Sequence, residues 1–356
     1  MSDNKQNVQR IWGEADYEPD DVAAINILAR KNIDFSHFVS GEGDETIKHA
    51  RSATYYNMLC DEDLCKYQGT YSNYLSGQVL VHLPIFIKGI GSDKPFPKDG
   101  HEFPNGLDKV ELLSHEQDYV TQFKNFVKAN PNNPVMVILK PFRELMKYAD
   151  QLSNELAQTT LWIYGSFNFR TLIPEYGAEK VLKVLNSFKR VYMYEAFLAC
   201  KNKEGSSSLN QHNMPEFYKR FMKLKETSPY IQVWNQLIIN WNEHIFEWAQ
   251  GALKRAQEDE KSGDADKIEK YKENTLRAQK IYDAIKENKD FQMICADIGV
   301  AVTFQNEKFA SYYKPVHLEF VPDSNYSKPT VVQDSKIFCA FDIPWELLEQ
   351  ELVKLF

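Results

Sequence analysis

The sequence has few cysteines, and they form no pattern that would bind a metal. Its five cysteines are Cys60, Cys65, Cys200, Cys295 and Cys339. An odd number of thiols without a Cys-x-x-Cys or a Cys/His pair predicts neither a zinc site nor a disulfide framework. Cys60 and Cys65 are close enough to pair, but two ordinary thiols are the preferred interpretation. We therefore expect a reduced protein of the cytoplasm.

Long apolar runs are also missing. No run approaches the roughly 18 apolar residues that a membrane helix requires. The first ten residues, MSDNKQNVQR, are polar and lack the apolar centre of a secretory signal. We expect no membrane association and no export.

The sequence has fewer basic residues than acidic ones. The chain has 42 Lys and Arg against 50 Asp and Glu, which gives a formal charge of −8. Nucleic-acid-binding proteins usually present a basic face, so we expect no nucleic-acid partner. Apolar residues make up 43% of the 356 residues, enough for the core of one large domain or of two smaller ones.

Short apolar runs alternate with helical periods, which is typical of repeated βα units. The predicted strands are residues 10–15, 34–41, 83–89, 134–141 and 159–166, then 317–321, 330–334 and 336–343. Residues 190–199 fit a strand or a helix, and 344–356 predict a closing helix. The expected fold is α/β, with a mainly parallel central sheet flanked by helices, in a single domain over residues 1–356.

Residues 201–290 are long, charged and helical, which predicts a helical insertion in that domain. Part of it reads as two solvated helices broken at residues 261–265. Such an insertion serves as a lid over a site or as a partner surface, and the sequence leaves both open.

Five carboxylates crowd the turn after the first predicted strand: Glu14, Asp16, Glu18, Asp20 and Asp21. Ligands of parallel sheets bind outside the carboxyl ends of the strands, and hard cations such as Ca²⁺ take oxygen ligands. The helix dipole also favours acidic residues at a helix start, so composition alone leaves a metal site and an exposed acidic turn open. The absence of a glycine-rich phosphate cradle argues against a dinucleotide site.

The spacing of these acids resembles the N-terminal signature of the nucleoside hydrolases, which is a strand, D-x-D-x-x-x-D-D and a helix. Glu14 replaces the first Asp, and Asp16, Asp20 and Asp21 match the others. Further similar segments follow in the family's order along almost the whole chain: FVSGEGDETIKHARSA, LPIFIKGIGSDKPFP, HEFPNGL, VMVILKPFRELMKYA, LWIYGSFN and ICADIGVAVTF. Their shared order favours a divergent member of this family.

The resemblance implies a Ca²⁺ ion held by the carboxylates of Asp16, Asp20, Asp21 and Asp297 and by the main-chain carbonyl of Arg143. Asp297 and the ion would also contact the ribose hydroxyls. Asp16 would take a proton as water attacks the anomeric carbon. The implied activity is hydrolysis of the N-ribosidic bond of a nucleoside or a related ribosyl compound. The dimers and tetramers of the family suggest a homo-oligomer.

Further pocket residues are hypotheses with ordinary alternatives. Asn168 would contact the ribose, or it is an ordinary Asn in a turn after a strand. Glu42 would face the sugar, or it caps the next helix. His101 is the best remaining acid for the leaving base, since the family's late His is Ala296 here, but a solvated loop His is the alternative.

Tryptophans 234, 241 and 248 recur at intervals of seven, which is typical of a buried helical stripe. One of them, with Trp241 preferred, would stack on a base, which slightly favours a purine.

Other departures leave two questions open. Lys88, Lys140, Arg143 and Arg170 would bring positive charge to a phosphorylated substrate, or they are surface residues, as Lys and Arg mostly are. The replaced residues Glu14 and Ala296 also fit a catalytically silent relative that binds a ribosyl ligand or a protein partner.

Overall fold

The computed structural model describes residues 9–41, 85–90, 118–165, 167–200, 208–258, 265–321 and 327–356, with single residues between 48 and 62. Within them, nine strands form one sheet in the order β10-β9-β11-β6-β5-β4-β1-β2-β3. The parallel strands are β1 (Gln9–Ala15), β2 (Ile33–Ser40), β3 (Ile85–Lys88), β4 (Val135–Ile138), β5 (Thr160–Tyr164), β6 (Arg190–Tyr194) and β11 (Ile337–Ala340). Two antiparallel strands, β9 (Tyr313–Phe320) and β10 (Ser327–Val331), complete one edge. The predicted α/β fold with a mainly parallel sheet is confirmed.

The burial pattern of the strands explains this arrangement. β4 has the sequence VMVI and is buried at every position, as a central parallel strand covered on both faces must be. β9 instead alternates between buried and more exposed residues, which is typical of an antiparallel strand with one solvent-exposed face. The ambiguous segment 190–199 divides into β6 and a short helix, α9 (Ala196–Ala199).

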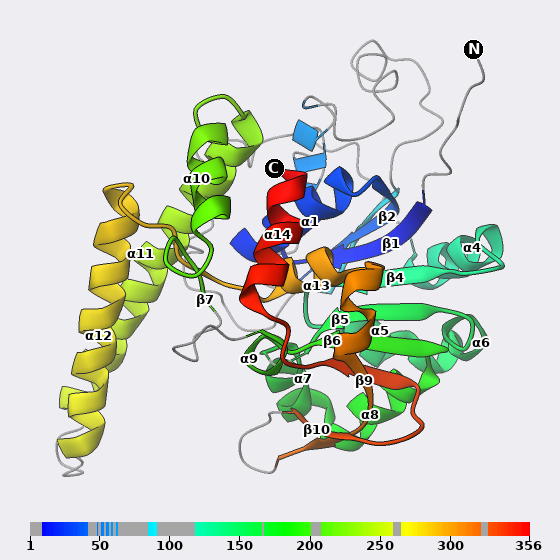
Figure 1. Ribbon diagram of the computed structural model, residues 1–356. Helices are drawn as coiled ribbons and strands as arrows, with labels where there is room; N and C mark the ends of the chain where they lie inside the picture. Colours follow the sequence, from blue (N-terminus) through cyan, green and yellow to red (C-terminus); the bar gives the residue numbers. More distant parts are fainter. Residues whose placement is uncertain are drawn as a thin grey trace, which may run out of the picture.

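Helices cover both faces of the sheet (Figure 1). Successive residues of a strand point to opposite faces, so Val135 and Val137 enter one apolar cluster while Met136 and Ile138 enter the other. The first cluster contains residues of α1 (Pro19–Arg30), α13 (Asp297–Thr303) and α14 (Trp345–Leu355). The second contains residues of α4 (Tyr119–Ala129), α5 (Arg143–Tyr148), α6 (Ser153–Leu156) and α8 (Ala178–Ser187). Shorter connections are α7 (Phe167–Tyr176) and the 3₁₀ turns η2 (Ala149–Gln151) and η4 (Glu307–Tyr312).

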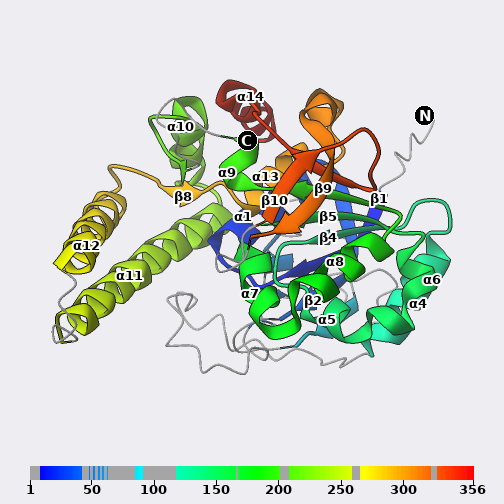
Figure 2. The same ribbon diagram turned by 90° about the horizontal axis from the view of Figure 1, so that it is seen from below.

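The predicted helical insertion is present as α10 (Pro215–Leu224), α11 (Pro229–Glu258) and α12 (Ala265–Lys286). α11 and α12 lie side by side and project away from the sheet (Figure 2). α11 ends at Glu258 and α12 begins at Ala265, and residues 261–264 of the predicted break lie outside the described residues. A two-stranded sheet of β7 (Ser208–Leu209) and β8 (Met293–Ile294) joins the insertion's two ends. None of the described helices is long and apolar enough to cross a membrane.

Candidate metal and substrate site

A cavity of about 390 Å³ opens at the carboxyl ends of the central strands, the usual place for a ligand in a parallel sheet. It is formed by the turn after β1, the ends of β4 and β5, the start of α7, the middle of α11, and β8 with the start of α13. We call it the acidic cavity, and its lining residues are Asp16, Glu18, Pro19, Asp20, Asp21, Leu139, Tyr164, Asn168, Trp241, Ile245, Met293, Ile294, Ala296 and Asp297.

Three carboxylates converge in this cavity. Asp20, Asp21 and Asp297 each offer an oxygen, and these atoms lie within 4.8 Å of one another. We call these three residues the acidic cluster. Asp20 and Asp21 stand in the first turn of α1, and Asp297 is the first residue of α13. The packing of α1 against α13 brings the two helix starts together, and their partial positive charges favour carboxylates there.

Asp21 also shapes the turn that precedes it. Its Oδ1 accepts a hydrogen bond from the main-chain N–H of Asp16 at 3.2 Å, and its Oδ2 accepts one from Glu18 at 3.2 Å. Between them Tyr17 has a φ of 58°, a left-handed conformation that residues other than glycine seldom adopt. The turn therefore folds Asp16 back over the start of α1 and into the cavity.

The carboxylates of the acidic cluster resist ionisation. Burial raises the pKa of Asp20 to about 7, and the charge of Asp16 adds to the effect. Burial and then the charge of Asp16 raise the pKa of Asp21 well above its usual range. Burial and then the charge of Asp20 do the same for Asp297. The Asp16 side chain thus lies close to all three carboxylates, although it is not part of the convergent group.

The acidic cluster fits a divalent cation. Asp297 Oδ1 is buried and accepts no hydrogen bond in the described part of the chain. No Lys or Arg of the described residues forms an ion pair with Asp20, Asp21 or Asp297. Carboxylates that are buried together, and unpaired, are stabilised by a cation with a preference for oxygen ligands.

Two other predicted residues line the same cavity. Asn168 is buried, and its Nδ2 donates to the carbonyl of Tyr164 at 3.0 Å, which fixes the amide at the end of β5. Trp241 lines the cavity from α11. The tryptophan stripe is divided, because Trp234 is fully buried in the core and Trp248 is 58% exposed.

Arg143 does not line the acidic cavity. Its guanidinium pairs with Glu175, with Nη2 2.7 Å from Oε1 and Nε 3.0 Å from Oε2. Coordination by its main-chain carbonyl stays a prediction. His101 and Glu42 lie outside the described residues, as do Cys60 and Cys65.

The idea of a phosphate-binding pocket gains no support here, because Lys88, Lys140, Arg143 and Arg170 are all absent from the cavity lining. Lys140 is also no surface residue. It is fully buried, and its Nζ lies 3.4 Å from Glu14 and forms a hydrogen-bonded pair with Glu144. The interpretation of Lys140 as a surface residue is therefore wrong, because two buried carboxylates hold its charge inside the protein.

This buried ionic network was missed by sequence reasoning. Glu14 also accepts hydrogen bonds from Trp12 Nε1 at 3.0 Å and from the hydroxyl of Tyr119 at 2.7 Å. Glu144 accepts the N–H of Ile90 at 2.6 Å, just after β3. The only signal in the sequence was a Lys directly after an apolar strand with a Glu four residues later. The network joins β1, β3, β4, α4 and α5 beside the acidic cavity.

An apolar wall of the acidic cavity was also missed. Leu139 follows β4, Ile245 lies one turn after Trp241 on α11, and Met293 and Ile294 form β8. These residues come from separate elements, so no local pattern predicts their assembly. The cavity is therefore lined by apolar residues as well as by acidic ones.

No family model matches the sequence, and no curated protein matches it. Among solved structures, the fold is similar to that of an inosine-uridine preferring nucleoside hydrolase from Bacillus anthracis, with a TM-score of 0.56. The two chains are 10% identical, and the match covers 98% of each. At this identity the likeness shows the fold, and the activity must be argued from the cavity.

Proposed function

We propose that this protein hydrolyses the N-ribosidic bond of a nucleoside in the acidic cavity, with a divalent cation held by the acidic cluster. The observation that carries the proposal is a single cavity lined by the acidic cluster, Asp16 and Asn168 together with apolar residues. A nucleoside needs both kinds of contact, because its sugar is polar and its base is a flat ring. The likeness to a nucleoside hydrolase fold supports the same reaction class.

Ca²⁺ is the ion we propose, because carboxylate oxygens are its preferred ligands. Asp20, Asp21 and Asp297 would hold it, with the carbonyl of Arg143 as a further ligand. When bound, the cation supplies positive charge that polarises a water and orients the ribose hydroxyls.

Asp16 is the proposed proton acceptor. It reaches into the cavity beside the acidic cluster without belonging to the convergent group, so its carboxylate is left to take a proton from the attacking water. As the N-ribosidic bond breaks and the base leaves, positive charge develops on the sugar. The surrounding carboxylates stabilise that charge electrostatically.

The base would lie against the apolar lining residues. Trp241 offers an indole for stacking, and Ile245 and Met293 exclude water beside it. A larger ring gains more from this surface, so we propose a purine nucleoside as the preferred substrate. Ala296 lines the cavity without an acidic proton, which leaves His101 as the candidate acid for the leaving base.

A second candidate is a ribosyl-binding protein without catalysis. The engagement of Glu14 by Lys140 and the lack of an acid at Ala296 favour it. Binding without turnover would then be the property of the same cavity.

The test is ribose release from inosine, adenosine, guanosine, uridine and cytidine, with Ca²⁺ and then with a chelator. Release that requires the cation supports the hydrolase. Bound Ca²⁺ without release from any nucleoside supports the second candidate, and the absence of cation binding by calorimetry refutes the metal site.

Variants separate the roles in the same assay. Asp16→Ala should abolish release while the protein still binds Ca²⁺, because the cluster of three remains. Asp334→Ala is the matched control, since Asp334 is exposed and outside the cavity, and it should leave release unchanged. Normal release from Asp16→Ala would show that Asp16 is not the proton acceptor.

A further inference from the structure

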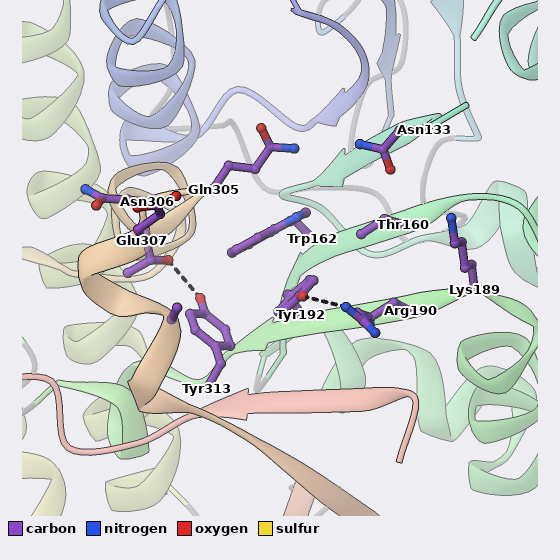
Figure 3. A pocket seen from close by; sticks show the side chains of 12 residues that line it. Asn133, Thr160, Trp162, Lys189, Arg190, Tyr192, Gln305, Asn306, Glu307 and Tyr313 are labelled. Atoms are coloured by element: carbon purple, nitrogen blue, oxygen red, sulfur yellow. Dashed lines mark hydrogen bonds between the residues drawn. The ribbon is translucent and has the colours of Figure 1, made fainter. Parts of the chain in front are cut away.

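A second cavity lies at the opposite end of the sheet. It has a volume of about 420 Å³ and includes Thr160 and Arg190, the first residues of β5 and β6 (Figure 3). The acidic cavity lies beyond the other ends of these strands. The two cavities share no lining residue, so the proposed hydrolysis leaves the second one without a role.

Three aromatic side chains of the second cavity form a rigid surface. Trp162 and Tyr192 face each other across β5 and β6 with ring centroids 4.4 Å apart and planes 18° apart. Tyr313 meets both rings edge-on at 5.5 and 5.6 Å. Its hydroxyl lies 2.8 Å from Thr303 Oγ1 at the end of α13, which fixes the ring in place. Tyr192 also stacks on Phe338 at 5.4 Å, and Trp162 and Tyr313 are each 6% exposed. A flat apolar ligand would therefore contact the part of these rings that remains uncovered in the cavity.

Charge is distributed unevenly around these rings. Lys189 and Arg190 lie on one side of them, and Asn306 and Glu307 lie on the other (Figure 3). Both cations are exposed, and neither has a carboxylate partner within 4.0 Å among the described residues. Arg190 is nevertheless held, because its Nη1 lies 3.3 Å from the Tyr192 hydroxyl and its guanidinium covers the Phe338 ring at 5.3 Å.

An ammonium and a guanidinium together offer several donors to a phosphate, and hydrogen bonds between charged groups are the stronger ones. The aromatic surface beside them lies where the rest of a phosphorylated ligand would extend. The volume is in the range of small-molecule sites in proteins.

We propose that this second cavity, the aromatic cavity, binds a nucleoside monophosphate. The phosphate pairs with Lys189 and Arg190, the base packs against Trp162 and Tyr192, and Glu307 accepts a hydrogen bond from an amino group of the base. This site is independent of the proposed hydrolysis, and it fits an anion that the carboxylates of the acidic cavity would repel.

The binding test is isothermal titration calorimetry of the chelator-treated full-length protein with adenosine 5′-monophosphate, adenosine and inorganic phosphate. We expect the monophosphate to bind at least tenfold more tightly than either part alone, with an affinity that falls as salt is added. Equal affinity for adenosine would overturn the role of the cations. Equal affinity for inorganic phosphate would overturn the role of the rings, and no binding of the monophosphate would overturn the site.

Matched variants locate the binding. Lys189→Ser with Arg190→Ser should weaken monophosphate binding at least tenfold. The control is Lys124→Ser with Lys128→Ser, which removes the same charge from exposed positions of α4 and should change nothing. Equal weakening by both pairs would show that net charge alone, and no built site, attracts the anion.

Three further variants test the rings and the alternative that the ligand binds in the acidic cavity. Tyr192→Leu should weaken binding, whereas Tyr192→Phe keeps the ring, loses only the hydroxyl that contacts Arg190 and should weaken binding less. Thermal unfolding would check that both variants are folded. Asp297→Asn alters the acidic cavity and should leave monophosphate binding unchanged. Loss of binding in Asp297→Asn would place the ligand in the acidic cavity and refute the proposal.

Discussion

Replacement of Lys140 by Met should strongly destabilise the protein. The Lys140 side chain is fully buried between two carboxylates that are themselves buried, those of Glu14 and Glu144. Burial tends to lower the pKa of Lys140, but Glu144 and Glu14 outweigh it and raise the pKa, so the amine is charged. Met has a similar length and no charge, and it leaves two acids without their cation.

The expected cost follows from what remains after the change. Removal of one partner of a buried ion pair costs about 3–5 kcal/mol. Glu14 would keep its donors Trp12 and Tyr119, and Glu144 would keep the N–H of Ile90. These neutral donors compensate only part of the lost charge, so we expect a decrease of about 3–4 kcal/mol in the free energy of unfolding.

Urea unfolding followed by circular dichroism measures this decrease. Lys183→Met is the control, because Lys183 pairs with Asp150 at the surface, and an exposed pair contributes at most about 1 kcal/mol. The triple change of Glu14→Gln, Lys140→Met and Glu144→Gln removes all three charges and should recover much of the loss. A cost below about 1 kcal/mol for Lys140→Met, or a triple variant less stable than Lys140→Met, would refute this account of the network.

Three further predictions concern the helices that carry the acidic cluster. Between about pH 4 and 7 the folded protein keeps a proton on Asp20 that the unfolded chain has released. The unfolding free energy of the metal-free protein should therefore fall as pH rises through this range. Added Ca²⁺ replaces that proton and should raise the melting temperature more at about pH 7.5 than at about pH 5, and an equal rise at both pH values would contradict this prediction. Lys31 donates to the carbonyls of Ala301 and Val302 at the end of α13, and Lys31→Met should cost about 1–3 kcal/mol in urea unfolding, while no cost would show that water replaces these bonds. A Cβ on Gly299 would lie 2.1 Å from Tyr194 Cζ. Gly299→Ala should therefore lower the free energy of unfolding by about 1–3 kcal/mol or more and weaken Ca²⁺ binding through α13. Wild-type stability and wild-type Ca²⁺ affinity would contradict the close packing.

The fold was predictable where the pattern is local. The run VMVI of β4 indicated a strand buried on both faces, and the alternation of short strands with helices indicated a parallel sheet. The antiparallel pairing of β9 with β11 and β10 depends on how the chain returns along the sheet edge, which no local pattern records. The boundary between β6 and α9 was ambiguous because apolar residues continue through both.

The acidic side of the candidate site was predictable only in part. Asp16, Asp20 and Asp21 stand in one turn, so their grouping follows from spacing, whereas Asp297 required a resemblance to a family motif. Lys140 could not be placed, because a Lys is assumed to be exposed unless its partners are known. Glu144 lies four residues after Lys140, and Glu14 lies on the neighbouring strand β1. Only the register of the sheet brings all three charges together.

The helical insertion lines part of the acidic cavity and also projects away from the sheet. α11 is anchored at its start, where the hydroxyl of Tyr230 donates to the carbonyl of Val22 at 2.6 Å and the N–H of Tyr230 donates to Glu62 at 2.7 Å. Val22 belongs to α1, the helix whose first turn holds two carboxylates of the acidic cluster. Trp241 lies eleven residues further along α11, about 16 Å from this anchor at the rise of an α-helix.

This anchor limits how the insertion can act as a lid. If α11 moved away from α1 as a rigid body, it would break the buried hydrogen bond to Val22. The same motion would move Trp241 away from the acidic cluster. The start of α11 therefore stays fixed with α1, and a lid motion would be confined to the distal part of α11 and to α12, which project from the sheet. Tyr230→Phe removes the bond to Val22 and keeps the ring, so it should increase hydrogen exchange at the start of α11 and weaken nucleoside binding. Unchanged exchange would show that apolar packing alone holds the helix.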